Sequence, residues 1–65
     1  MEENRIAEAL SEWIAKPGNT QVIAAQRIGI GEGTLRNRMS GYTPWKWSEA
    51  VKVARLTGKK LTDFE

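Results

Sequence analysis

The sequence contains no cysteine and no histidine. This excludes disulfides, thiolate and imidazole metal ligands, and the commonest general base of enzymes. The chain also lacks a phosphate-binding glycine loop, and its paired carboxylates, Glu2 with Glu3 and Asp63 with Glu65, stand at the two ends of the sequence. We therefore expect no catalysis, no metal or organic cofactor, and no small-molecule ligand.

Long hydrophobic runs are missing as well. No apolar stretch approaches the roughly 20 residues that a membrane-spanning helix needs. The first residues lack the basic start and apolar stretch of a secretory signal. We expect a soluble cytoplasmic protein with no membrane partner, and the absence of cysteine fits a reducing compartment.

The length of 65 residues corresponds to one small domain, residues 1–65, near the lower limit for burying a core unaided. Domains of this size usually add disulfides, a metal or a partner subunit. Without cysteine or histidine, the remaining supports are very efficient helix packing or a second copy of the chain.

Charge is distributed unevenly, although the net charge is only +2. Residues 1–18 hold two basic and four acidic side chains, whereas residues 27–60 hold eight basic and two acidic ones. An acidic beginning and a basic body favour a positive face turned toward a polyanion, although a solvated surface of ordinary charges accounts for the same counts.

Glycine and proline divide the chain into four helix-length segments and a short tail. The first segment, 3–16, repeats apolar side chains at helical spacing and ends before Pro17 and Gly18. Its apolar stripe consists of Ile6, Leu10, Trp13 and Ile14. No segment shows the alternation that a strand requires, so the predicted fold class is all-α.

Two short helices follow. Thr20 can cap a helix that begins at Gln21, because its hydroxyl accepts a hydrogen bond from an otherwise unpaired backbone N–H. Gly29 ends that helix in the left-handed conformation that glycine adopts freely. The next helix is expected over residues 32–40, with Gly41 after it, and its inner side carries Leu35 and Met39.

A fourth helix is expected to start at Thr43 and Pro44, as a cap and a first-turn proline, and to stop at Gly58. Its predicted inner stripe consists of Trp47, Ala50, Val51 and Ala54. We therefore expect Trp47 in the core, together with Trp13. Trp45 falls outside the stripe and is left as a wedge, a dimer contact or a cover over the core. Leu61 and Phe64 are expected to fold back as a short hydrophobic tail.

The most informative segment is residues 21–41. Two short helices joined by a tight turn need a small residue where they cross, a glycine in the turn, and apolar residues that hold the pair to the core. These requirements are met in order by Ala25, Gly29, Ile30 and Leu35.

With these residues, the chain resembles the lambda repressor and Cro superfamily of helix-turn-helix proteins. The resemblance extends from Thr20 to the C-terminus, through Ser40-Gly41 and the tail 61–64. It implies a compact bundle of four to five helices that binds duplex DNA, usually as a homodimer, and regulates transcription in phages, plasmids or bacteria. Three features depart from the pattern: Val22 and Ile23 are apolar at usually polar sites, Arg38 takes a usually apolar site, and Glu32 replaces a common glutamine.

If residues 32–40 form the recognition helix, one outward arc of that helix enters the major groove. The arc holds four base-reading candidates, Glu32, Gly33, Arg36 and Asn37. Arg36 suits guanine and Asn37 suits adenine, because each can form two hydrogen bonds to its base. An internal ion pair between Glu32 and Arg36 competes with this interpretation.

Phosphate contacts are expected on both sides of that helix. Asn19, Thr20 and Gln21 lie at the start of the second helix, where free N–H groups favour anions. The other candidates are Thr34, Arg38, Ser40, Tyr42, Thr43 and Lys46.

The sequence therefore predicts a sequence-specific, double-stranded DNA-binding transcriptional regulator, resembling a Cro-like repressor and homodimeric at least on DNA. The alternative is a helical protein-interaction module that docks onto another regulator without binding DNA. The apolar side chains outside the predicted stripes are compatible with that alternative and equally with homodimerisation: Val22, Ile23, Val53, Leu56, Leu61 and Phe64.

Overall fold

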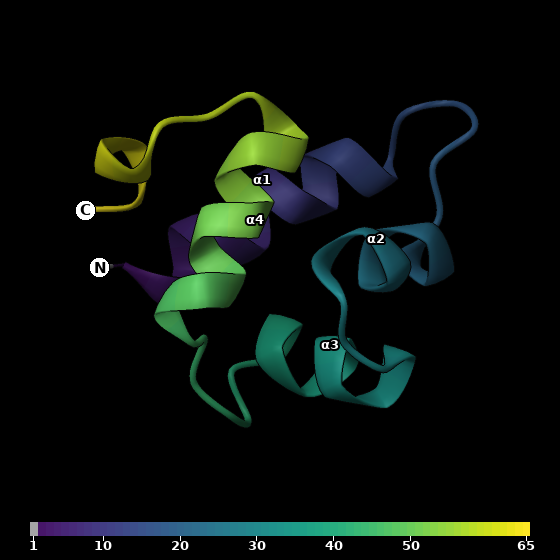
Figure 1. The fold of residues 1–65 in the computed structure, drawn as a ribbon, viewed down its shortest axis with the longest axis horizontal. Coiled ribbons are helices and arrows are strands. Elements are labelled where there is room, and N and C mark those ends of the chain that lie inside the picture. The colour runs from purple at the N-terminus through teal and green to yellow at the C-terminus, as the bar shows by residue number, and fades with distance from the viewer. Residues whose placement is uncertain (1) are drawn as a thin grey trace.

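The apolar stripe of the first segment forms one wall of the core in the computed structural model, which describes residues 2–65 (Figure 1). Helix α1 (Glu3–Ile14) buries Ile6 and Leu10 completely, and Trp13 packs partly buried against the same core. The helix ends two residues before the predicted boundary, where Ala15 takes the cap position ahead of Pro17.

The predicted cap and stop of the second helix are confirmed. Helix α2 (Gln21–Ile28) starts after Thr20, whose Oγ1 accepts a hydrogen bond from the Ile23 N–H at 3.1 Å. Gly29 ends the helix with φ 84°, a left-handed conformation that a residue with a Cβ rarely adopts. The next helix, α3 (Glu32–Met39), is also confirmed to within one residue.

The start of the fourth helix differs from the prediction. Helix α4 (Trp47–Thr57) begins after Lys46, so Thr43 and Pro44 belong to the preceding loop and cap nothing. The side chain of Glu49 reaches back to the start of the helix, where its Oε1 accepts a hydrogen bond from the Lys46 N–H at 2.9 Å. A carboxylate in the first turn of α4 thus replaces the expected threonine and proline signal.

Helix α4 also buries a side that differs from the predicted stripe. Its buried residues are Glu49, Ala50, Val53 and Ala54, whereas Val51 is only half-buried. The expectation that Trp47 lies in the core is wrong, since this side chain is 62% exposed. Trp45, only 5% exposed, fills the core from the loop instead, which settles its role in favour of a core residue.

The helices form one core. Figure 1 shows α1 and α4 crossing on one side of the molecule, with α2 and α3 on the other. The chain ends in a short 3-10 helix, η1 (Leu61–Phe64), whose Phe64 is buried as expected for a hydrophobic tail. The carbonyl of Phe64 accepts a hydrogen bond from the Glu2 N–H, so the two ends of the described chain lie together.

The residues 2–65 therefore form an all-α fold of four α-helices and one 3-10 helix, without strands, which confirms the predicted class. None of these helices has the length and apolarity to cross a membrane.

Candidate nucleic-acid interface

A three-residue turn joins α2 to α3 and determines how the two helices meet. The Gly29 and Ile30 N–H groups both donate to the carbonyl of Ala25, at 2.8 and 3.0 Å. Ala25 is 3% exposed, and Ile30 packs partly buried against the core. The small residue, the glycine and the apolar residue after it therefore occupy the places expected for a tight helix pair.

One side of α3 is turned away from the protein. Leu35 is completely buried and Met39 packs against the core, which fixes the rotation of this helix. The four base-reading candidates Glu32, Gly33, Arg36 and Asn37 are all exposed. We call these four residues the outer face of α3. These four positions are open to solvent within residues 2–65, whereas the opposite side of the helix packs against the core.

The predicted ion pair between Glu32 and Arg36 is present. The nearest atoms, Glu32 Oε1 and Arg36 Nη2, are 3.6 Å apart, and the two side chains are 47% and 68% exposed. A pair this open to solvent typically contributes less than about 1 kcal/mol. The guanidinium of Arg36 can therefore exchange this partner for another acceptor at little cost.

The expected phosphate contacts at the start of α2 are partly engaged inside the protein. The side chain of Asn19 donates to the carbonyl of Trp13 at 2.8 Å, which ties the α1–α2 loop to the end of α1. Thr20 is exposed and Gln21 is half-buried. The hydroxyl proton of Thr20 remains available, since its oxygen acts as the acceptor in the helix cap.

The candidates around the end of α3 also differ in their surroundings. Ser40, Tyr42 and Lys46 are exposed, and Tyr42 is the most open of them at 81%. The hydroxyl of Ser40 donates to the Asn37 carbonyl at 3.2 Å. Thr34, in the first turn of α3, is half-buried.

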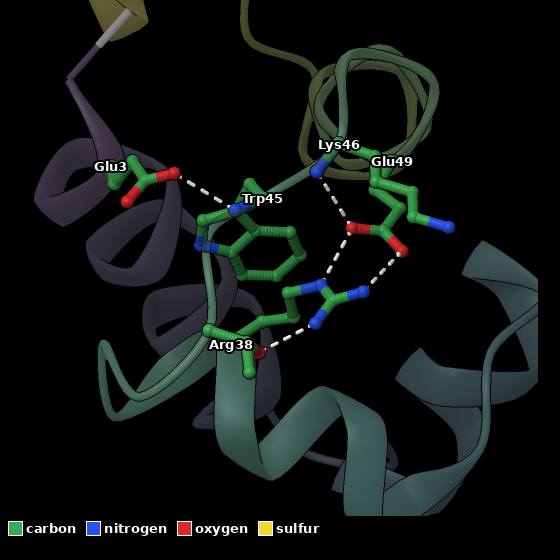
Figure 2. A network of polar contacts seen from close by, with 6 residues as sticks. Glu3, Arg38, Trp45, Lys46 and Glu49 are labelled. Atoms are coloured by element: carbon green, nitrogen blue, oxygen red, sulfur yellow. Dashed lines mark hydrogen bonds and ion pairs between the residues drawn. The ribbon is translucent and has the colours of Figure 1, made fainter.

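Arg38 contradicts the expectation of a free cation after the recognition helix. Its Nε and Nη2 donate to the two carboxylate oxygens of Glu49 at 2.9 and 3.3 Å, as Figure 2 shows. Its Nη1 donates to Thr43 Oγ1 at 2.5 Å. Only 12% of the Arg38 side chain is exposed. The hydrogen bonds of Arg38 to Glu49 and Thr43 therefore stabilise the protein, and neither Arg38 nor Thr43 is free to contact phosphate.

The partner of Arg38 is a buried carboxylate, and its titration reflects this pairing. Burial raises the pKa of Glu49, but the hydrogen bonds from Arg38 and from the Lys46 N–H, with the charges of both residues, outweigh it and leave the pKa lowered. The same hydrogen bond, stronger than the opposing effect of burial, raises the pKa of Arg38. Both groups therefore remain charged at neutral pH.

Trp45 extends this network to the first residue of α1. Its backbone N–H donates to Glu3 Oε2 at 2.8 Å (Figure 2). Within residues 2–65 its buried indole nitrogen has no hydrogen-bond acceptor. We call Glu3, Arg38, Thr43, Trp45, Lys46 and Glu49 the Arg38 cluster. The cluster links α1, the α3–α4 loop and α4 to the last turn of α3, and so holds that helix in position.

Sequence reasoning missed Glu3 and Glu49 as members of this cluster. The available signal was Arg38 itself, because an arginine at a site that packs inward needs a carboxylate partner. The burial of Val53 and Phe64 also removes two of the apolar side chains on which a protein-docking module would draw, whereas Val22 remains 46% exposed.

The fold and the site define a class, a small all-helical bundle that presents one short polar helix to its surroundings. Among known proteins, no protein-family model matches this chain, and neither a curated sequence nor a solved structure matches it significantly.

Proposed function

We propose that this protein is a sequence-specific, double-stranded DNA-binding regulator of transcription that inserts α3 into the major groove. The proposal includes the Cro-like helix-turn-helix arrangement that the sequence resembles. Its setting would be the cytoplasm of a bacterium or of a phage-infected host cell.

The observation that carries the proposal is the exposure of the outer face of α3 on a helix that packs against the core from behind. Leu35 anchors the helix to the core, and the Arg38 cluster holds its last turn. An α-helix fits the width of the major groove, and polar side chains on its outer side can reach base edges. Arg36 is the candidate for guanine and Asn37 for adenine.

Charge supports the same proposal. Arg36 in α3 and Lys46, directly before α4, are both exposed cations. Lys46 forms no ion pair within the described residues. Thr20 and Gln21 stand at the start of α2, where free backbone N–H groups attract phosphate. The exposed hydroxyl of Tyr42 completes the proposed backbone contacts, and that of Ser40 joins them by exchanging its hydrogen bond to the Asn37 carbonyl.

We further propose that two copies bind one operator. A two-fold operator presents two major-groove sites about one helical turn apart, which a symmetric dimer matches. The concentration of the protein itself would then set occupancy, through assembly of the dimer on DNA.

The test is a selection of bound sequences from a random pool of duplexes, followed by binding of the selected duplex in fluorescence anisotropy across a salt series. We expect an enriched motif with two-fold symmetry. The logarithm of the binding constant should fall by about 0.9 per phosphate contact for each tenfold rise in salt concentration. Heparin is the control. It is a polyanion without bases, so it should bind through charge alone, with an affinity that depends on salt. An unenriched pool and an affinity insensitive to salt would favour the protein-interaction module instead.

A further inference from the structure

A groove between α2 and α4 lies outside the proposed DNA-reading helix. It has a volume of about 350 Å³ and is lined by Arg27, Lys52, Arg55 and Leu56. Arg27 comes from the last turn of α2, whereas the other three come from α4. None of these residues belongs to α3. Tertiary packing therefore brings together cations that are about 25 residues apart in the sequence.

The three cations of the groove have no acidic partner within the described residues. The two ion pairs within the described residues lie elsewhere and join Arg36 to Glu32 and Arg38 to Glu49. Lys52 lies beside the α2–α3 turn, since a Cβ on Gly29 would stand 3.5 Å from its Nζ. The partial negative charge at the end of α2 can offset only about half of one positive charge. The groove thus holds positive charge that the protein leaves uncompensated.

The chemistry of the lining indicates what would fill it. Guanidinium groups bind carboxylates through paired hydrogen bonds, and Lys52 adds a further cation. Leu56 is half-buried and offers an apolar contact between these charges. Phosphate sites on DNA-binding proteins use arginine and lysine together with hydroxyl, amide or helix N-terminal donors, and no hydroxyl or amide side chain lines this groove. Acidic side chains flanking an apolar one fit these four residues better than a nucleic-acid backbone does.

We propose that the α2–α4 groove binds an acidic peptide segment of a partner protein, with carboxylates on Arg27, Lys52 and Arg55 and an apolar side chain on Leu56. The proposal does not depend on DNA binding, because the outer face of α3 contributes nothing to the groove. For a regulator of this size, such a groove provides a contact with another protein while α3 stays free.

The probe is a short synthetic peptide of glutamate and leucine residues, titrated into the ¹⁵N-labelled protein at low salt. We expect amide shifts centred on Arg27, Lys52, Arg55 and Leu56, with the outer face of α3 unaffected. The double variant K52Q/R55Q should weaken peptide binding roughly tenfold, since it removes two of the three cations that pair with the peptide carboxylates. A peptide with glutamine in place of glutamate should not bind.

The matched control is K16Q/K60Q, which removes the same charge from exposed positions outside the groove. Circular dichroism verifies that both double variants are folded. Retained peptide affinity in K16Q/K60Q supports a specific groove. Equal losses in the two double variants, or the absence of shifts in the unsubstituted protein, would overturn the proposal.

The affinity for duplex DNA tests whether the groove contacts nucleic acid instead of a peptide. If K52Q/R55Q weakens DNA binding as strongly as a substitution at Arg36 does, the groove belongs to the DNA interface and the peptide proposal is wrong. If the protein binds the peptide but no DNA, the function proposed for α3 fails and the groove proposal stands.

Discussion

Two arginines on α3, only two residues apart in the sequence, occupy opposite environments. Arg36 belongs to the outer face, where 68% of its side chain is exposed and its contact with Glu32 is 3.6 Å long. Arg38 belongs to the Arg38 cluster, where 12% is exposed and the contact with Glu49 is 2.9 Å long. The same side chain therefore has a structural role in one place and is available for recognition in the other.

Helix rotation and the presence of a fixed acceptor decide the role of each arginine. Two residues along a helix correspond to a rotation of about 200°, which turns one side chain outward when the other points inward. Glu49 then supplies both carboxylate oxygens to Arg38, whereas Glu32 supplies a single distant oxygen to Arg36. The substitutions below separate the two roles.

Substitution of Arg38 by alanine should have the largest effect. It leaves the carboxylate of Glu49 buried without its main partner, and we expect a loss of about 3 kcal/mol in the free energy of unfolding, measured by urea denaturation. The control R36A should change the stability by less than about 0.5 kcal/mol, because its side chain is exposed. The double variant R38M/E49Q should recover most of the loss, since neither residue then leaves a buried charge. Similar losses in R38A and R36A would remove the distinction between the two arginines.

Arg36→Ala should act on recognition instead. We expect a loss of about 1–3 kcal/mol in binding to the preferred duplex, confined to one base pair of each half-site. Competition of the selected duplex with single-base variants measures this effect. A uniform loss across all competitors would show that Arg36 contacts phosphate and that the assignment of base reading to it is wrong.

The Arg38 cluster should also make stability depend on acidity. The pKa of Glu49 is lower in the folded protein than its ordinary value of 4.5, so its stabilising contribution is present above that pH and is lost as the pH falls through the folded value. Thermal unfolding followed between neutral and acidic pH should show a falling midpoint, by less than Arg38→Ala produces at neutral pH. In E49Q the midpoint should fall less between neutral and acidic pH. In the control E8Q, a substitution at an exposed position, it should fall as much as in the unsubstituted protein. An identical pH profile for E49Q and the unsubstituted protein would contradict the role of Glu49.

Lys46→Ala should produce the smallest effect. Its backbone N–H, not its side chain, bonds to Glu49, so stability should change little. The exposed ammonium is proposed to contact phosphate, and its loss should weaken all duplexes about equally while lowering the salt slope by about 1. Anisotropy titrations at several salt concentrations give both quantities. If Lys46→Ala changed sequence preference in the way expected of Arg36→Ala, the proposed division between base and phosphate contacts would be incorrect.

Local signals in the sequence predicted α2 and α3 well. The hydroxyl of Thr20 caps α2 and the left-handed Gly29 ends it, and both effects act within one turn of helix. Leu35 and its neighbours then place Arg36 and Asn37 on the outside, as the helical period requires. The exposure of the candidate base readers was therefore predictable, whereas their contact with DNA remains a prediction.

The loop before α4 was not predictable in the same way. Thr43 and Pro44 form a strong local start signal, yet α4 begins at Trp47, where Glu49 bonds to both Lys46 and Arg38. Trp45 and Trp47 are chemically identical, and helical periodicity favoured the wrong one for the core. Only the space left between α1, α3 and α4 decides which indole is buried.

Helix periods, caps and glycine stops act between residues close together in the chain, so the all-α class, the α2–α3 pair and its outward polar side follow from the local sequence. Long-range packing is needed to turn Arg38 inward, to place Trp45 instead of Trp47 in the core, and to bring Arg27 together with Lys52 and Arg55 in one groove. These outcomes depend on partners on other helices, and the free energy of burying or pairing a side chain is set by the groups that surround it in space.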